Sequence, residues 1–261
     1  MKSPRLLPFV LLLSVVCLAP LRAADASPWP AIQRENKPWT RWWWPGSAVD
    51  KANITSQLEA IDAAGFGGVE ITPIYGAKGY EDRFIDFLSP KWMEMLEYVG
   101  HEGQRLGLAI DMATGTGWPF GGPWITPEFS NTKIVLKDGR LAGEPTGQMV
   151  KRSAPGDVGL VIDPYSPEAI RRYLAPFDQA FANFPQNLIH TQFHDSFEYY
   201  DASWTPELPK LFQQMHGYDI QQFAAELMGA KPLDADTLAR VKTDYRETIS
   251  QLHLDYLHTW V

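Results

Sequence analysis

The residues best suited to chemistry lie together in the segment HDSFEYY at 194–200, directly after a predicted strand over 188–193. His194, Asp195 and Glu198 bring an imidazole and two carboxyl groups to the end of that strand. Glycoside hydrolysis needs two carboxyl groups flanking the scissile bond, about 5–5.5 Å apart in retaining enzymes and about 6.5–9.5 Å apart in inverting ones. Asp195 and Glu198 are too close in sequence to guarantee this spacing, so a second carboxyl group can come from another strand.

Two other chemistries remain open to the same segment. A Ser-His-Asp triad using Ser196 is poorly supported, because no G-x-S-x-G elbow surrounds that serine. His190, His194, Asp195 and Glu198 offer ligands for a metal ion, although no H-E-x-x-H pattern is present. For a hard cation such as Ca²⁺, carboxylate and carbonyl oxygens suffice. The remaining histidines lie on predicted helices or their ends and are expected at the surface or in packing contacts: His101, His216, His253 and His258.

Two further carboxyl groups lie on predicted strands. Glu70 is in the middle of the apolar strand over 67–74, and Asp111 is near the end of the strand over 108–112. A buried carboxylate without a partner is costly, so such residues bind a ligand, a metal or an arginine. Structural ion pairing is the simpler explanation for either residue alone, whereas the two together at one end of a sheet favour a binding site.

Tryptophan is unusually frequent near the predicted strand ends. In the run WWWPG at 42–46, alternation along a strand places Trp42 and Trp44 on one face and Trp43 on the other. One face can pack under helices while the other lines a pocket, and flat aromatic rings suit the apolar faces of sugars. Trp43 and Trp44 are therefore candidate sugar contacts, with core packing as the alternative for each.

A long loop rich in glycine, proline and aromatic residues follows the third strand. Its sequence is GTGWPFGGPW at 115–124, which lacks the lysine and the serine or threonine of a phosphate-binding P-loop. Such a loop is expensive to order unless it has a function. We interpret it as a rigid lip over a ligand pocket, with Trp118 and Trp124 as substrate-binding candidates.

Strand and helix patterns alternate along the chain and position these residues. Strands are predicted over 40–44, 67–74, 108–112 and 188–193, helices over 49–64 and 89–107, from 166, from 205 and from 236 to the end, and a hairpin over 133–141. This alternation predicts an α/β fold with a parallel sheet covered by helices. Functional residues at strand ends are typical of a (β/α)₈ TIM barrel. Only four strand–helix units are visible, so residues 30–261 are expected to form the N-terminal portion of such a barrel, truncated at its C-terminus; a complete open α/β sheet is the alternative.

Composition and charge limit the classes of molecule that the protein is expected to bind. The 261 residues include 23 Lys and Arg against 31 Asp and Glu, a formal net charge of −8. Nucleic acids and anionic membranes normally require a basic excess, so both are disfavoured. Residues 1–24 have the basic start, short apolar run and small residues of a signal peptide. We therefore expect a periplasmic or secreted product, without cysteine because Cys17 would be removed with the signal.

Several ordered motifs resemble glycoside hydrolase family 106, whose characterised members are α-L-rhamnosidases. The matching segments are RWWWPG at 41–46, GGVEI at 67–71, GTGWPFGGPW at 115–124, KRSAPG at 151–156, HDSFEYY at 194–200, WTPEL at 204–208 and HGYDI at 216–220. The resemblance implies an exported enzyme with an N-terminal (β/α)₈ barrel and β-rich domains after it. It also implies inverting hydrolysis by two glutamates, with calcium at the sugar site. Family members are several times longer and have a larger insertion between Trp124 and Lys151, so at least one catalytic carboxyl group is expected beyond Val261.

These observations predict a secreted, inverting α-L-rhamnosidase that removes terminal L-rhamnose from glycans, of which this chain is a fragment that can be inactive alone. The alternatives are a non-catalytic carbohydrate-binding fragment and a metal-dependent hydrolase of another class, which would bind a transition metal through His190 and His194. A carbohydrate is the expected partner; the oligomeric state and the linkage cleaved are not predicted. The candidate site residues are Glu198 and Asp195 as catalytic groups, and Trp43, Trp44, Glu70, Asp111, Trp118, Trp124 and His194 as substrate contacts.

Overall fold

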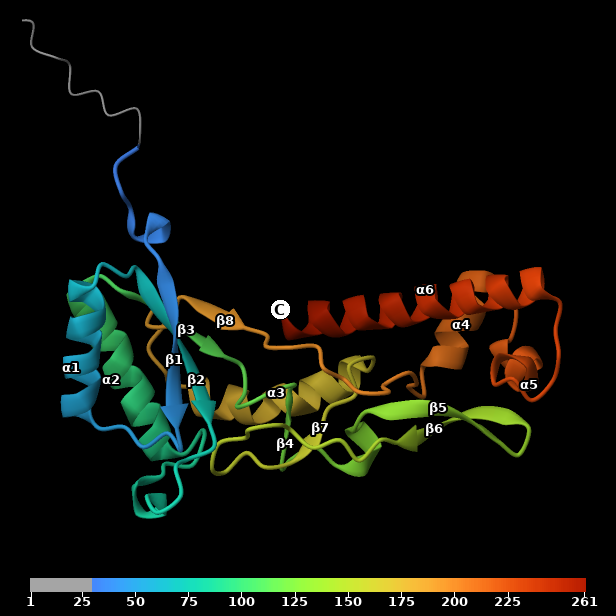
Figure 1. Ribbon diagram of the computed structural model, residues 1–261, viewed down its shortest axis with the longest axis horizontal. Coiled ribbons are helices and arrows are strands. Elements are labelled where there is room, and N and C mark those ends of the chain that lie inside the picture. The colour runs from blue at the N-terminus through green and yellow to red at the C-terminus, as the bar shows by residue number, and fades with distance from the viewer. Residues whose placement is uncertain (1–29) are drawn as a thin grey trace, which may run out of the picture. The chain divides into compact units, whose positions relative to one another are not determined.

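The computed structural model describes residues 30–261, of which residues 33–261 form one compact unit (Figure 1). The predicted signal peptide over 1–24 and Cys17 lie outside the described residues. The first part of the unit contains η1 (Arg34–Asn36), β1 (Trp39–Pro45), α1 (Lys51–Ala63), β2 (Gly68–Ile74), η2 (Glu81–Arg83), α2 (Pro90–Leu106) and β3 (Ala109–Ala113). The second part contains β4 (Gly121–Gly122), η3 (Pro127–Phe129), β5 (Thr132–Lys137), β6 (Arg140–Pro145), β7 (Leu160–Val161), α3 (Pro167–Phe181), β8 (Thr191–Phe193), α4 (Leu208–His216), η4 (Ile220–Phe223), α5 (Ala224–Leu227) and α6 (Ala235–Trp260).

Strands β1, β2, β3 and β8 form one parallel sheet in chain order. Helices α1 and α2 lie side by side against this sheet, as Figure 1 shows. The predicted parallel sheet with helical connections is thus confirmed as a mixed α/β fold. Over the described residues the sheet is open and has four strands, so closure into an eight-stranded barrel remains a prediction.

Local capping explains where the connecting helices begin and end. Asp50 accepts a hydrogen bond from the backbone N–H of Asn53 at the start of α1, and Ser89 accepts one from Trp92 at the start of α2. Pro90 occupies the first turn of α2, where its missing N–H costs nothing. Gly107 ends α2 with φ of 71°, a left-handed conformation that glycine adopts without strain.

The buried face of α2 and the even-numbered side chains of β1 build the main core. Trp92, Met95, Leu96 and Val99 recur at helical spacing and are fully buried. They pack with residues of the sheet and of α3, including Trp42, Trp44, Ile71, Met112 and Phe177. Helices α1 and α2 do not cover the opposite face of the sheet, and that face carries the charged residues described below.

A second core lies between the β5–β6 hairpin and the C-terminal helices. Its buried members include Leu141, Trp204, Leu208, Phe212 and Leu252. Helix α6 contacts both α3 and α4, and so joins the two cores (Figure 1). The hairpin itself was predicted around Asp138 and Gly139, and the structure confirms it.

The region between β3 and α3 is more ordered than the sequence pattern indicates. Gly121–Gly122 pairs antiparallel with Leu160–Val161, although two-residue strands have no recognisable periodicity. A Cβ atom on Gly121 would lie 2.2 Å from the carbonyl oxygen of Leu160, so the pairing requires glycine there. The long predicted loop is therefore held to the segment that precedes α3.

Candidate functional site

Three charged residues lie in register on the free face of the sheet. Arg41 of β1 pairs with Glu70 of β2, which pairs with Asp111 of β3. The guanidinium of Arg41 lies 3.1 Å from a carboxylate oxygen of Glu70 and 3.3 Å from one of Asp195, which follows β8. Arg41 therefore connects the first strand, the second strand and the segment after the fourth.

The two carboxylates bound by Arg41 are largely enclosed. The exposed fraction of the side chain is 19% for Glu70 and 11% for Asp195. Burial raises the pKa of Glu70, while Arg41 and a hydrogen bond from Thr72 at 3.1 Å oppose that rise. Glu70 is thus the kind of carboxyl group that retains a proton more readily than an exposed one.

Asp111 forms a separate pair on the same face. Its carboxylate lies 2.9 Å from Nδ1 of His190, just before β8. Burial is the main influence on Asp111 and raises its pKa, whereas His190 and Thr191 lower it. The sequence prediction that Glu70 and Asp111 lie together is confirmed by their register. The simpler expectation of ion pairing is confirmed for Glu70 with Arg41, while the partner of Asp111 is the imidazole of His190.

Aromatic rings lie beyond this charged layer, toward the carboxyl ends of the strands. Trp43 is 44% exposed, and its ring centroid is 6.4 Å from that of Trp118. The Arg41 guanidinium lies 5.3 Å from the centroid of Trp43, and the Arg152 guanidinium lies 5.5 Å from that of Trp118. The exposed indole ring of Trp43 on β1 and the half-buried ring of Trp118 in the loop after β3 thus lie beside cationic groups.

Glu198 belongs to a second ionic group at the same edge. Its carboxylate accepts hydrogen bonds from Nζ of Lys151 at 2.8 Å and from the hydroxyl of Tyr200 at 2.9 Å, and Lys151 also contacts that hydroxyl. The hydrogen bonds from Lys151 and then Tyr200 hold the pKa of Glu198 below its usual value. The backbone of Lys151 exchanges hydrogen bonds with that of Trp118, at 2.9 and 3.0 Å, so this group adjoins the aromatic one.

The sequence prediction missed the cations of the site. Arg41, Lys151 and Arg152 each contact a predicted site residue, yet none was selected as a candidate. Arg41 could have been found from strand alternation, which places it on the same face as Trp43. Lys151 and Arg152 lie in the KRSAPG segment and carry no local signal of their partners.

Two predicted sugar contacts belong to the core. Trp44 is 1% exposed and packs edge-on against Trp42 and Trp92. Trp124 is partly buried and packs against Tyr173 and Phe177 of α3. The predicted split of the tryptophan run is confirmed, but Trp44 is on the face covered by helices, and Trp124 lies at the far end of its loop. Of the four tryptophans selected, Trp43 and Trp118 are the pair that meets.

His194 also lies apart from the charged face. Its ring stacks near Phe120 and Phe197, and Nε2 lies 3.2 Å from the hydroxyl of Tyr256 on α6. Burial lowers the pKa of His194 to about 4, so the ring is neutral at pH 7. His190 pairs with Asp111 instead, so the structure does not bring His190 and His194 together as the ligands of one metal ion.

The site combines enclosed carboxyl groups with the exposed ring of Trp43 and the half-buried ring of Trp118, and comparison with known proteins identifies the family. A family model described as alpha-L-rhamnosidase matches residues 31–146 and 139–259. The chain therefore belongs to glycoside hydrolase family 106, as its motifs indicated.

Two individual proteins are similar over part of their length. The structure of a rhamnosidase from Novosphingobium sp. PP1Y superposes with a TM-score of 0.69 at 13% identity, over 87% of this chain and 45% of that one. A Formosa agariphila protein named "Putative beta-glucuronidase" is 29% identical over 127 residues, which are 48% of this chain and 10% of that protein. The chain thus spans less than half of either protein, and the structural match shows a shared fold.

Proposed function

We propose that this chain is part of an inverting α-L-rhamnosidase that removes terminal L-rhamnose from glycans. The observation that carries the proposal is the contact of Arg41 with both Glu70 and Asp195 below the exposed ring of Trp43. An aromatic platform binds the apolar face of a sugar ring, and the charged layer offers partners to its hydroxyl groups. A glycosidase function agrees with the family to which the chain belongs.

The environments of the carboxyl groups suggest different roles. Glu198 is held ionised by Lys151 and Tyr200, which suits a base that activates water or a charge that stabilises the transition state. A proton donor requires a raised pKa, and Glu70 and Asp111 meet that condition. Asp195, fixed by Arg41, is the second carboxylate that we assign to the active site.

The family resemblance also implied calcium. Oxygen donors suit this cation in kind, but each carboxylate of the site already has a side-chain partner: Arg41 for Glu70 and Asp195, Lys151 for Glu198 and the imidazole of His190 for Asp111. The described residues therefore do not form a site with the spare negative charge that Ca²⁺ requires, and we derive no catalytic step from it. Calorimetric titration with CaCl₂, and activity with and without chelator, tests calcium directly.

Release of 4-nitrophenol from the α-L-rhamnopyranoside tests the activity, with the β-D-glucuronide as a parallel substrate. We expect turnover of the rhamnoside only, and ¹H NMR should show β-L-rhamnose as the first product because the mechanism inverts. Turnover of the glucuronide alone would contradict the substrate, and α-L-rhamnose as first product would contradict inversion.

A carbohydrate-binding role without catalysis is the second candidate, favoured by the exposure of Trp43 beside Trp118. It predicts quenching or enhancement of tryptophan fluorescence by L-rhamnose without hydrolysis of any rhamnoside.

Export to the periplasm or beyond is proposed from residues 1–24, and N-terminal sequencing of the exported protein should find a start after Ala23, Ala24 or Ala26. Among the described residues, no helix has the length and apolar content needed to span a bilayer.

A further inference from the structure

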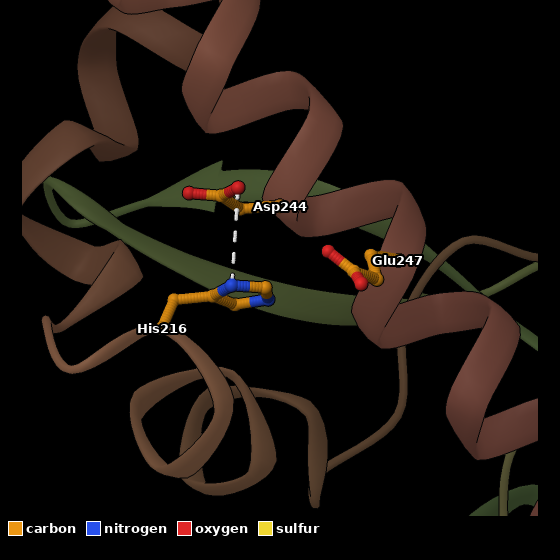
Figure 2. A group of neighbouring side chains, drawn as sticks. All are labelled: His216, Asp244 and Glu247. Atoms are coloured by element: carbon orange, nitrogen blue, oxygen red, sulfur yellow. Dashed lines mark ion pairs between the residues drawn. The ribbon is translucent and has the colours of Figure 1, made fainter.

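His216, Asp244 and Glu247 form a group of potential metal ligands beside the second core, outside the candidate site on the sheet (Figure 2). His216 is the last residue of α4, while Asp244 and Glu247 lie one helical turn apart on α6. One ligand atom from each side chain lies within 4.8 Å of the other two. Within residues 30–261, no other three His, Cys, Asp or Glu side chains approach one another so closely.

The hydrogen bonds around His216 define which nitrogen is available. The hydroxyl of Thr248 donates its proton to the carbonyl oxygen of Asp244 at 2.9 Å. Its oxygen lies 3.1 Å from Nε2 of His216, and it must therefore accept a hydrogen bond from Nε2–H. In a neutral imidazole this leaves a lone pair on Nδ1, which is the nitrogen that faces the carboxylate of Asp244 (Figure 2).

The carboxylate of Asp244 is oriented in the same way. Tyr218 donates a hydrogen bond to Oδ2 at 2.7 Å, and Oδ1 faces Nδ1 of His216 at 3.8 Å. This gap is too long for a hydrogen bond. It matches two metal–ligand bonds of about 2.0–2.2 Å that meet at an open angle. Two electron-rich atoms, each held by a hydrogen bond from behind, therefore face each other across a space that a cation would fill.

We propose that Nδ1 of His216 and the carboxylates of Asp244 and Glu247 bind one divalent transition-metal ion of the Zn²⁺ class. An imidazole with two carboxylates suits such an ion better than Ca²⁺ or Mg²⁺, which prefer oxygen alone. Thr248 and Tyr218 act as the supporting hydrogen-bond partners that metal-binding His and Asp residues usually have. The ion would tie the end of α4 to α6 and stabilise the second core, because it binds the folded chain and not the unfolded one.

Zn²⁺ added to the full chain tests the proposal by isothermal titration calorimetry and thermal unfolding. We expect one strong site per chain and a rise in Tm, with both lost in His216→Ala. Glu247→Gln should weaken binding at least about tenfold, and Thr248→Val by about 10–100-fold. His101→Ala is the matched control, because the side chain of His101 is exposed on α2 with Glu97 as its ionic partner, and its loss should change neither result.

Co²⁺ provides a second readout that does not depend on the stability of the His216 variant. Glu247 is exposed, so Glu247→Gln should fold, and its Co²⁺ complex should have altered visible absorption bands. No strong Zn²⁺ site in the unmodified chain, or binding and Co²⁺ spectra unchanged in Glu247→Gln, would overturn the proposal.

Discussion

Arg41 and Glu70 occupy directly paired positions on β1 and β2, and their side chains meet at 3.1 Å on the face of the sheet away from α1 and α2. Asp195 binds the same guanidinium. Removing Arg41 therefore leaves two enclosed carboxylates without their cation. Arg41→Ala is expected to lower the free energy of unfolding by about 1–3 kcal/mol, measured by urea denaturation at pH 7.

Arg171→Ala is the matched control for that experiment. Arg171 and Glu168 form an exposed pair on α3 at 3.5 Å, and such surface pairs contribute about 0–1 kcal/mol. If Arg41→Ala and Arg171→Ala lower the free energy of unfolding equally, the enclosed position of Arg41 does not increase its contribution to stability.

Trp43 and Trp44 are neighbours in sequence but should respond oppositely to truncation. Trp43→Ala removes an exposed ring, so stability should change little while affinity for L-rhamnose falls by about tenfold or more. Trp44→Ala removes a fully buried ring and should cost about 3–5 kcal/mol of stability. Fluorescence titration with L-rhamnose and urea unfolding of both variants measure the two effects. Unchanged sugar affinity in Trp43→Ala would contradict the platform role.

Lys151 controls the ionisation of Glu198, so its removal should shift the pH dependence of activity. The hydrogen bond from Lys151 is the main cause that lowers the pKa of Glu198. Without it the carboxylate protonates at higher pH, and the acidic limb of the profile of kcat/KM should move upward in Lys151→Ala. Glu198→Gln should lower kcat/KM by about 100-fold or more. Lys133→Ala, which removes an exposed pair with Glu144 on the hairpin, should leave the profile unchanged.

Asp157 makes stability depend on pH. This residue is fully buried, one of its oxygens accepts a hydrogen bond from Thr116 at 2.6 Å, and burial raises its pKa to about 8. The folded chain therefore holds a proton that the unfolded chain releases near pH 4. The contribution of Asp157 to stability is complete below that pH, decreases as pH rises toward about 8 and is constant above it.

Asp157→Asn mimics the protonated side chain and should remove the decrease in stability that accompanies rising pH. We expect a flatter dependence of Tm on pH between about 4 and 8, and a higher Tm at pH 8 than in the unmodified chain. Asp82→Asn, at an exposed position in η2, is the control. Parallel curves for the unmodified chain and Asp157→Asn would contradict the assignment.

The elements that carry the site were predictable because they have strong local signals. The cap at Ser89, the proline after it and the recurrence of apolar residues define α2, and the alternation in the tryptophan run separates Trp43 from Trp44. The alignment of Glu70 with Asp111 followed from parallel strands of similar length. These features depend on neighbours within a few residues.

The missed features depend on residues far apart in the chain. Asp195 contacts Arg41 across 154 positions, and no local pattern encodes such a pair. Trp124 was selected because it shares a loop with Trp118. Its ring instead packs against α3, which lies much further along the sequence. Composition shows that aromatic residues are abundant, while tertiary packing decides which of them remain exposed.

Over the described residues, β1 and β8 are the two borders of the parallel sheet. A border strand presents backbone N–H and C=O groups that can recruit a strand from another molecule. In β1 this border is rich in tryptophan, and Arg41 and Pro45 are the residues there that oppose such pairing, one by charge and one by its missing donor. We therefore expect concentrated solutions of this chain to aggregate through β1, and an uncharged residue in place of Arg41 to increase that aggregation.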